Sequence, residues 1–73
     1  MSIKADNVIR HIEKNGHATL KLDRASGFTL LTISKRGNDY VVGYQPGSMI
    51  KRINRADLRA MLVENAIYVE SWR

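Results

Sequence analysis

Apolar residues recur at helical spacing near the start of the chain. Four of them follow the i, i+3, i+4, i+7 order of a buried helix stripe: Ala5, Val8, Ile9 and Ile12. The pair Asn15-Gly16 comes next and is typical of a left-handed turn that ends a helix. The pattern therefore predicts a helix over about residues 4–14.

From residue 17 onward the spacing of apolar positions changes to two. Alternation over residues 17–23 predicts a strand with one face toward water. Residues 28–34 (FTLLTIS) are apolar on both faces and predict a central strand. A hairpin turn at residues 35–39 then leads to a returning strand, YVVGYQ, over residues 40–45. A proline-glycine turn at residues 45–48 precedes another short strand, residues 49–53.

A second helix is predicted to begin at Arg55. Asn54 can cap it, and Asp57 stands at the third helical position. Its buried stripe would be Leu58, Met61, Leu62 and Ala66. Residues 67–72 alternate again and predict a C-terminal strand at a sheet edge. The fold class is thus α+β: an N-terminal helix, a three- to four-stranded antiparallel sheet, a second helix and a last edge strand.

Length and composition indicate one small globular domain covering residues 1–73. The 73 residues are 44% hydrophobic and 26% charged, which is typical of a folded chain with a modest core. There is no cysteine, so disulfides and thiolate metal sites are excluded. No leader pattern and no apolar run long enough to span a bilayer occur, so we expect a cytoplasmic protein without a membrane partner.

Positive charge is concentrated in the second half of the sequence. The chain carries twelve Lys and Arg against seven Asp and Glu, a formal net charge of +5. Six of the cations lie between residues 35 and 59, where the only acids are Asp39 and Asp57: Lys35, Arg36, Lys51, Arg52, Arg55 and Arg59. Such clustering indicates a polyanion partner. We therefore expect a nucleic-acid-binding module that contacts phosphates, with Tyr40 or Tyr44 stacking on bases or sugars.

Three of these arginines lie close to the start of the second helix. Positive charge opposes the helix dipole there, and a phosphate held by the side chains and the first backbone amides would compensate. The alternative is that Arg55 and Arg59 pair with Asp57 on the surface, which contributes little to stability.

Catalytic constellations are absent from the sequence. His11 and His17 are six residues apart, which fits no zinc-binding spacing. No serine lies in a nucleophile elbow, and no glycine pattern of a phosphate-binding loop occurs. We predict no metal, no cofactor and no enzymatic activity.

The order of predicted elements resembles two families. Residues 28–62, three strands with a basic hairpin and then a capped helix, resemble the arm-type DNA-binding domain of phage integrases. That resemblance implies that the hairpin with Lys35, Arg36, Tyr40 and Tyr44 faces DNA. With the first helix added, the order is similar to double-stranded-RNA-binding folds and to HicA-type ribonuclease toxins. The catalytic histidine of those toxins has no counterpart near Gly27, and His17 lies on the preceding strand.

Two alternatives to nucleic-acid binding stay open. One is a protein-interaction or inhibitor domain, of the sort encoded by phages and mobile elements, that docks on an acidic partner with Trp72 and Tyr68 as anchors. A homodimer through an exposed sheet edge belongs to the same class. The other is a HicA-like toxin. The deciding question is whether the basic pair at residues 35 and 36 and the basic segment at residues 51–59 share one face.

Overall fold

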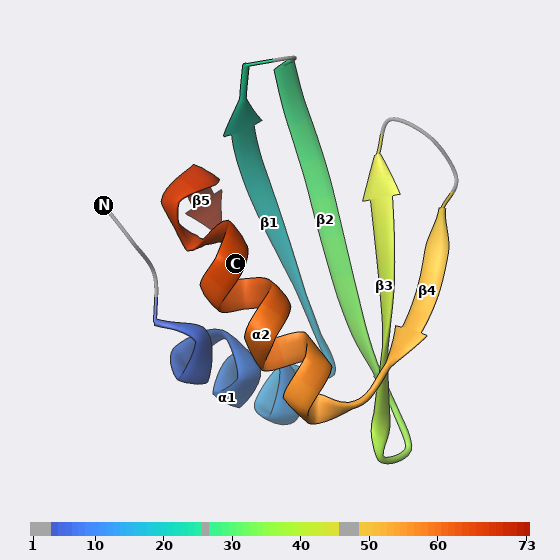
Figure 1. Cartoon of the computed structure of the whole chain (residues 1–73). Coiled ribbons are helices and arrows are strands. Elements are labelled where there is room, and N and C mark those ends of the chain that lie inside the picture. The colour runs from blue at the N-terminus through green and yellow to red at the C-terminus, as the bar shows by residue number, and fades with distance from the viewer. Residues whose placement is uncertain (1–3, 26, 46–48) are drawn as a thin grey trace.

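The chain forms two layers, a five-stranded antiparallel sheet and two helices packed on one of its faces (Figure 1). The structure is a computed structural model that describes residues 4–25, 27–45 and 49–73. The predicted α+β order is confirmed. In chain order the elements are α1 (Ala5–Asn15), β1 (His17–Arg24), β2 (Gly27–Arg36), β3 (Asp39–Gln45), β4 (Ile50–Ile53), α2 (Arg55–Asn65), the 3-10 turn η1 (Ala66–Tyr68) and β5 (Val69–Trp72).

Both helices have the end signals that their sequences predict. Gly16 adopts the left-handed conformation, with φ of 88°, and its N–H donates to the carbonyl of Ile12 at 2.7 Å, which ends α1. Asn54 caps α2, because its side-chain oxygen accepts a hydrogen bond from the Asp57 N–H at 2.8 Å. The predicted turn at residues 45–48 lies, beyond Gln45, outside the described residues.

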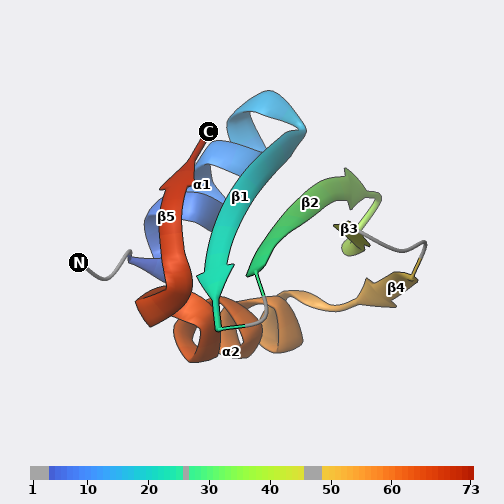
Figure 2. The same cartoon turned by 90° about the horizontal axis from the view of Figure 1, so that it is seen from above.

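The strands lie in the order β4-β3-β2-β1-β5, which Figure 2 shows from above. All neighbours are antiparallel, and β2 is central, as its sequence predicts. The β2–β3 hairpin turns at Gly37 and Asn38, with Gly37 at a φ of 61°. β5 returns from α2 to the far edge, where Trp72 lies opposite Leu20 of β1.

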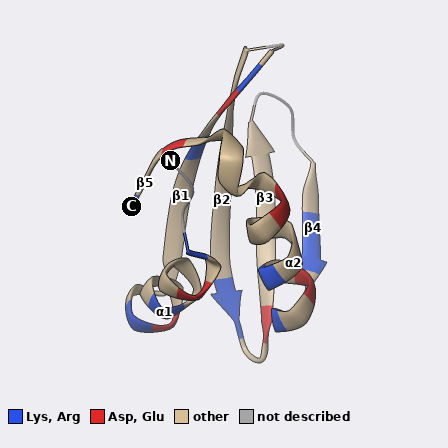
Figure 3. Ribbon diagram, turned by 60° about the vertical axis from the view of Figure 1, so that its left-hand side comes forward, with Lys and Arg blue, Asp and Glu red and all other residues tan. Residues whose placement is uncertain are grey.

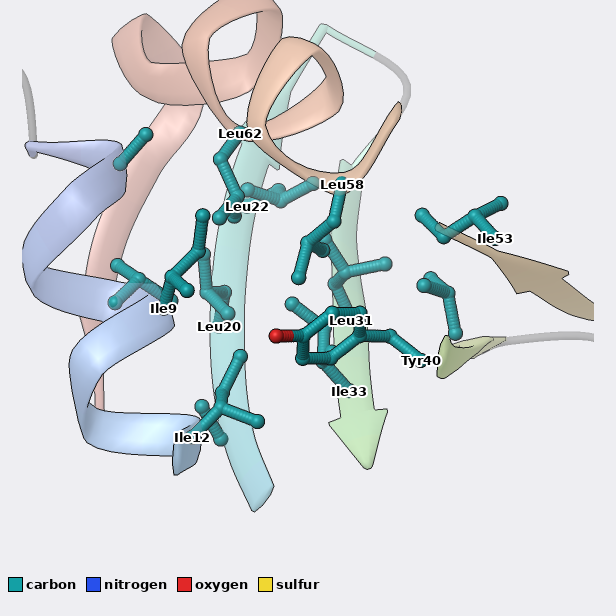
Figure 4. Packing of buried hydrophobic residues seen from close by; sticks show 14 residues of the cluster. Ile9, Ile12, Leu20, Leu22, Leu31, Ile33, Tyr40, Ile53, Leu58 and Leu62 are labelled. Carbon is teal, nitrogen blue, oxygen red and sulfur yellow. The ribbon is translucent and has the colours of Figure 1, made fainter. Parts of the chain in front are cut away.

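The hydrophobic core lies between the helices and one face of the sheet (Figure 4). The alternating residues of β1, β2 and β3 supply the sheet side, and the stripes of α1 and α2 supply the helix side. The predicted stripe of α2 is confirmed, with Leu58 and Leu62 fully buried. The core consists of Ala5, Val8, Ile9, Ile12, Ala18, Leu20, Leu22, Leu31, Ile33, Tyr40, Val42, Ile53, Leu58 and Leu62.

No described element covers the opposite face of the sheet. On β2 this face carries Phe28 and Leu30, which are 53% and 39% exposed, whereas Leu31 and Ile33 point into the core. An apolar pattern on both sides of a strand usually means burial on both sides. β2 instead has one buried face and one apolar face that is exposed.

Candidate functional site

The two basic groups of the sequence meet at the end of the molecule where the β2–β3 hairpin turns. Lys35, near the end of β2, and Arg55, the first residue of α2, both contact Glu13 in the last turn of α1. Lys35 Nζ is 3.1 Å from Glu13 Oε2, and Arg55 Nη1 is 3.5 Å from Glu13 Oε1. One carboxylate therefore holds together cations that are twenty positions apart in the sequence.

Tyr40 also contacts Glu13, from the core side of this cluster. Its ring lies in the core with the hydroxyl pointing toward α1 (Figure 4), and the hydroxyl donates a hydrogen bond to Glu13 Oε1. That bond, followed by the one from Lys35, lowers the pKa of Glu13. Burial and the bond to Glu13 raise the pKa of Tyr40, while the bond to Glu13 raises that of Lys35. The carboxylate is thus held ionised and the phenol and ammonium protonated.

A second link joins the hairpin to β4. Arg52 Nε donates to Asp39 Oδ2 at 3.1 Å, and Asp39 lies opposite Arg36 across the hairpin. We call this region the basic end and define it by five cations and two acids: Lys14, Lys35, Arg36, Arg52 and Arg55, with Glu13 and Asp39. Five cations against two acids leave three of the chain's five net positive charges here. Figure 3 shows Lys and Arg segments of α1, β2, β4 and α2 around this lower end, with acidic segments between them.

Two of the six predicted cations lie outside the basic end. Arg59, one turn along α2, donates from Nε to Asp6 Oδ1 at 3.1 Å. Lys51 lies on β4, on the side of the sheet that the helices cover, and lines an open groove of about 690 Å³ beside α2. The surface pairs expected between Asp57 and Arg55 or Arg59 do not form. Acids of α1 replace Asp57, because the two helices pack side by side.

The two tyrosines predicted to stack on bases face the core side of the sheet. Tyr40 is only 1% exposed, and the hydroxyl of half-buried Tyr44 contacts Met61 Sδ at 3.4 Å. The prediction that Tyr40 stacks on nucleic acid is therefore wrong, because its ring has no accessible face. The sequence carried the signal: the other face of β3, with Val41, Gly43 and Gln45, is the more polar one and belongs toward water.

The predicted partner anchors at the C-terminus already have contacts within the chain. Trp72 is half-buried and meets the ring of His11 edge-on, with 5.3 Å between centroids. Tyr68 lies under the guanidinium of Arg24, with 5.2 Å from the guanidinium carbon to the ring centroid. Trp72 also borders a shallow hollow of about 290 Å³ on the uncovered face, next to Leu30. Both rings thus combine an intramolecular contact with some exposed area.

The described residues form no metal-binding cluster. Within residues 4–25, 27–45 and 49–73, no three His, Asp or Glu side chains are placed to hold a metal ion. His17 is exposed at the start of β1, opposite Ser34, and hydrogen-bonds to no described side chain. In the described part of the chain, neither helix has the length and apolar character needed to cross a membrane.

Comparison of the chain with known proteins assigns this site no role. No protein-family model matches it, and neither a curated protein nor a solved structure does.

Proposed function

We propose that this protein binds nucleic acid through phosphate contacts at the basic end. The observation that carries the proposal is the meeting of the two basic groups around Glu13 and Asp39. Separate in sequence, Lys35 and Arg36 on the hairpin join Arg52 and Arg55 at one end of the molecule. They do not share one face: Lys35 and Arg55 lie on the helix side of the sheet, and the register places Arg36 and Arg52 on the uncovered side. A phosphate backbone presents regularly spaced negative charge, and cations drawn from four elements can contact several phosphates at once.

The existing ion pairs do not prevent such contacts. Arg52 and Arg55 are 63% and 65% exposed, and exposed pairs of this kind stabilise a fold by only about 0–1 kcal/mol. A phosphate can therefore replace the carboxylate at either arginine with little loss. Lys35 is bound more firmly, because it is half-buried, contacts Glu13 and lies over the Tyr40 ring.

Salt dependence measures the number of contacts. With three net charges, affinity should fall by a factor of about 40 between 50 and 200 mM salt, since each phosphate contact adds about 0.9 to the logarithmic slope. All six cations of the sequence cluster would have given a factor on the order of a thousand. The smaller value reflects the positions of Lys51 and Arg59 and the two acids that remain.

The test is a binding titration with labelled duplex and single-stranded DNA and RNA. The double variant Arg36→Gln, Arg52→Gln should lose most of the affinity and flatten the salt slope by about two contacts. Lys4→Gln with Lys21→Gln is the matched control, because it removes the same charge away from the basic end. Equal losses in the two double variants, or no binding of any probe at low salt, would contradict the proposal.

A second candidate is an acidic protein partner on the uncovered face of the sheet. The observation that favours it is the exposure of Phe28 and Leu30 beside the hollow that Trp72, Lys21 and Arg73 border. An apolar centre with cations at its rim suits an acidic partner. A partner recovered after nuclease treatment should be acidic and should be lost with Leu30→Asp but retained with Arg36→Gln, Arg52→Gln. The opposite pattern would rule this face out.

A further inference from the structure

The outward side of α2 carries an apolar stripe that the fold of one chain does not use. Leu58 and Leu62 bury the inner side of the helix. On the outer side, Val63 is 56% exposed, and Ile67, in the turn directly after α2, is 73% exposed. With two exposed alanines they follow a 4-3-4 spacing, which keeps them on one side of a helix: Ala56, Ala60, Val63 and Ile67. This spacing is that of a helix that pairs with another helix.

The two borders of this stripe have opposite charge. Arg59 precedes Ala60 on one border, and Glu64 follows Val63 on the other. Successive helix residues turn by about 100°, so Arg59 and Glu64 stand at about equal angles on either side of the stripe. Asp57 strengthens the acidic border, and Arg55 extends the basic one. The outer side of α2 is therefore apolar in the middle, positive along one border and negative along the other.

The two borders also differ in shape. On the arginine side α2 has α1 beside it, joined through Arg59 and Asp6. On the carboxylate side lies the open groove of about 690 Å³, which Asp57, Ala60 and Glu64 line. A raised border with positive charge thus accompanies a groove whose α2 side carries Asp57 and Glu64, while Lys51 and Arg24 line its other side.

We propose that this surface docks a second copy of the chain, with the two α2 helices side by side and parallel. In a parallel pair each arginine border faces the partner's carboxylate border, and Arg59 meets the partner's Glu64, five positions further along, as in parallel coiled coils. Each α1 then lies over the partner's groove. An antiparallel pair would place like charges together on both borders, which is unfavourable.

The contact is small, and the dimer is accordingly weak. Four apolar side chains over three helical turns, two of them alanines, bury less than the roughly 1,000 Å² of a stable interface. Association should therefore be visible only at high protein concentration. Apart from Arg55 at its border, the surface lies outside the basic end, and the apolar stripe does not depend on nucleic acid binding there.

Sedimentation over about a hundredfold range of concentration tests the dimer, since a weak pair shifts from monomer to dimer across such a range. The wild-type mass should rise toward twice the monomer value, and Val63→Lys should remain monomeric. Ile50→Lys is the matched control: Ile50 is an equally apolar, exposed residue, but it lies on the sheet edge at β4. A wild-type chain that stays monomeric, or an association that Ile50→Lys abolishes and Val63→Lys does not, overturns the proposal.

Cross-linking tests whether the two α2 helices are parallel. The sequence has no cysteine, so any disulfide comes from the introduced residue. Ala56→Cys and Ala60→Cys, one helical turn apart, should each form a disulfide-linked dimer under mild oxidation, because parallel helices bring each position close to itself. Asn7→Cys, exposed on α1, provides the background rate. If either variant on α2 links no faster than Asn7→Cys, the parallel arrangement is wrong.

Discussion

Replacing Glu13 with glutamine should strengthen the binding of nucleic acid. Glu13 is, among the described residues, the carboxylate that contacts both Lys35 and Arg55, so the substitution removes the competitor for two cations at once. The glutamine side-chain oxygen can still accept the hydrogen bond from Tyr40, so the fold keeps that contact. The perturbation therefore changes charge at the basic end with little change in shape.

The size of the effect follows from the charge count. The basic end holds five cations and two acids, and Glu13→Gln raises its net charge by one. One further phosphate contact steepens the logarithmic salt slope by about 0.9 and raises affinity about fivefold at 0.15 M salt. Fluorescence anisotropy of a labelled duplex at four or more salt concentrations, on the order of 0.05 to 0.3 M, measures both quantities.

Asp23→Asn is the matched control for this prediction. It removes the same charge near the β1–β2 turn, at the opposite end of the sheet. Screening over that distance should keep its effect below about twofold. If Glu13→Gln leaves affinity unchanged or weakens it, or if Asp23→Asn strengthens binding equally, then the basic end is not where nucleic acid binds.

Three further predictions concern stability. Tyr40→Phe removes the hydrogen bond to Glu13 and should lower the free energy of unfolding by about 1 to 2 kcal/mol, read from urea titration. Asn54→Ala removes the cap of α2 and should cost about 1 kcal/mol in the same assay, whereas Asn54→Asp should retain most of the stability. The pKa of Glu13 is lowered in the folded state, so its ionised form stabilises the fold above pH 4.5, and that contribution is lost as the pH falls through the lowered pKa. The melting temperatures of wild type and Glu13→Gln should therefore converge on acidification, and a constant difference would contradict this reading.

Local signals in the sequence predicted most of the secondary structure. Gly16 ends α1 because only a residue without a Cβ takes its backbone conformation easily, and Asn54 starts α2 because its side chain satisfies an amide three residues on. Alternation identified the strands, and the apolar stretch around Leu31 identified the central one. In each case the physical cause lies within a few residues of the element that it determines.

The sequence predicted the cations of the basic end but not the acids that pair with them, because these pairs join distant segments of the chain. The cations were visible in the sequence, but their acidic partners were not: Arg59 pairs with Asp6, and Arg55 with Glu13, each more than forty positions away. Alternation also divides β3 into two faces, and the more polar one carries Val41, Gly43 and Gln45. The stacking role predicted for Tyr40 does not follow this signal, and the ring lies in the core.

The position of β5 has a consequence for the kinetics of folding. The β1–β2, β2–β3 and β3–β4 pairs join neighbouring segments, whereas Leu22 of β1 and Val69 of β5 pair although 47 positions separate them in the sequence. Closing so long a loop is entropically costly, so this pairing should form after the local hairpins. The only tryptophan of the sequence, Trp72, lies in that last strand against His11. Its fluorescence therefore reports the final closure of the sheet, while backbone circular dichroism reports the hairpins and helices that precede it.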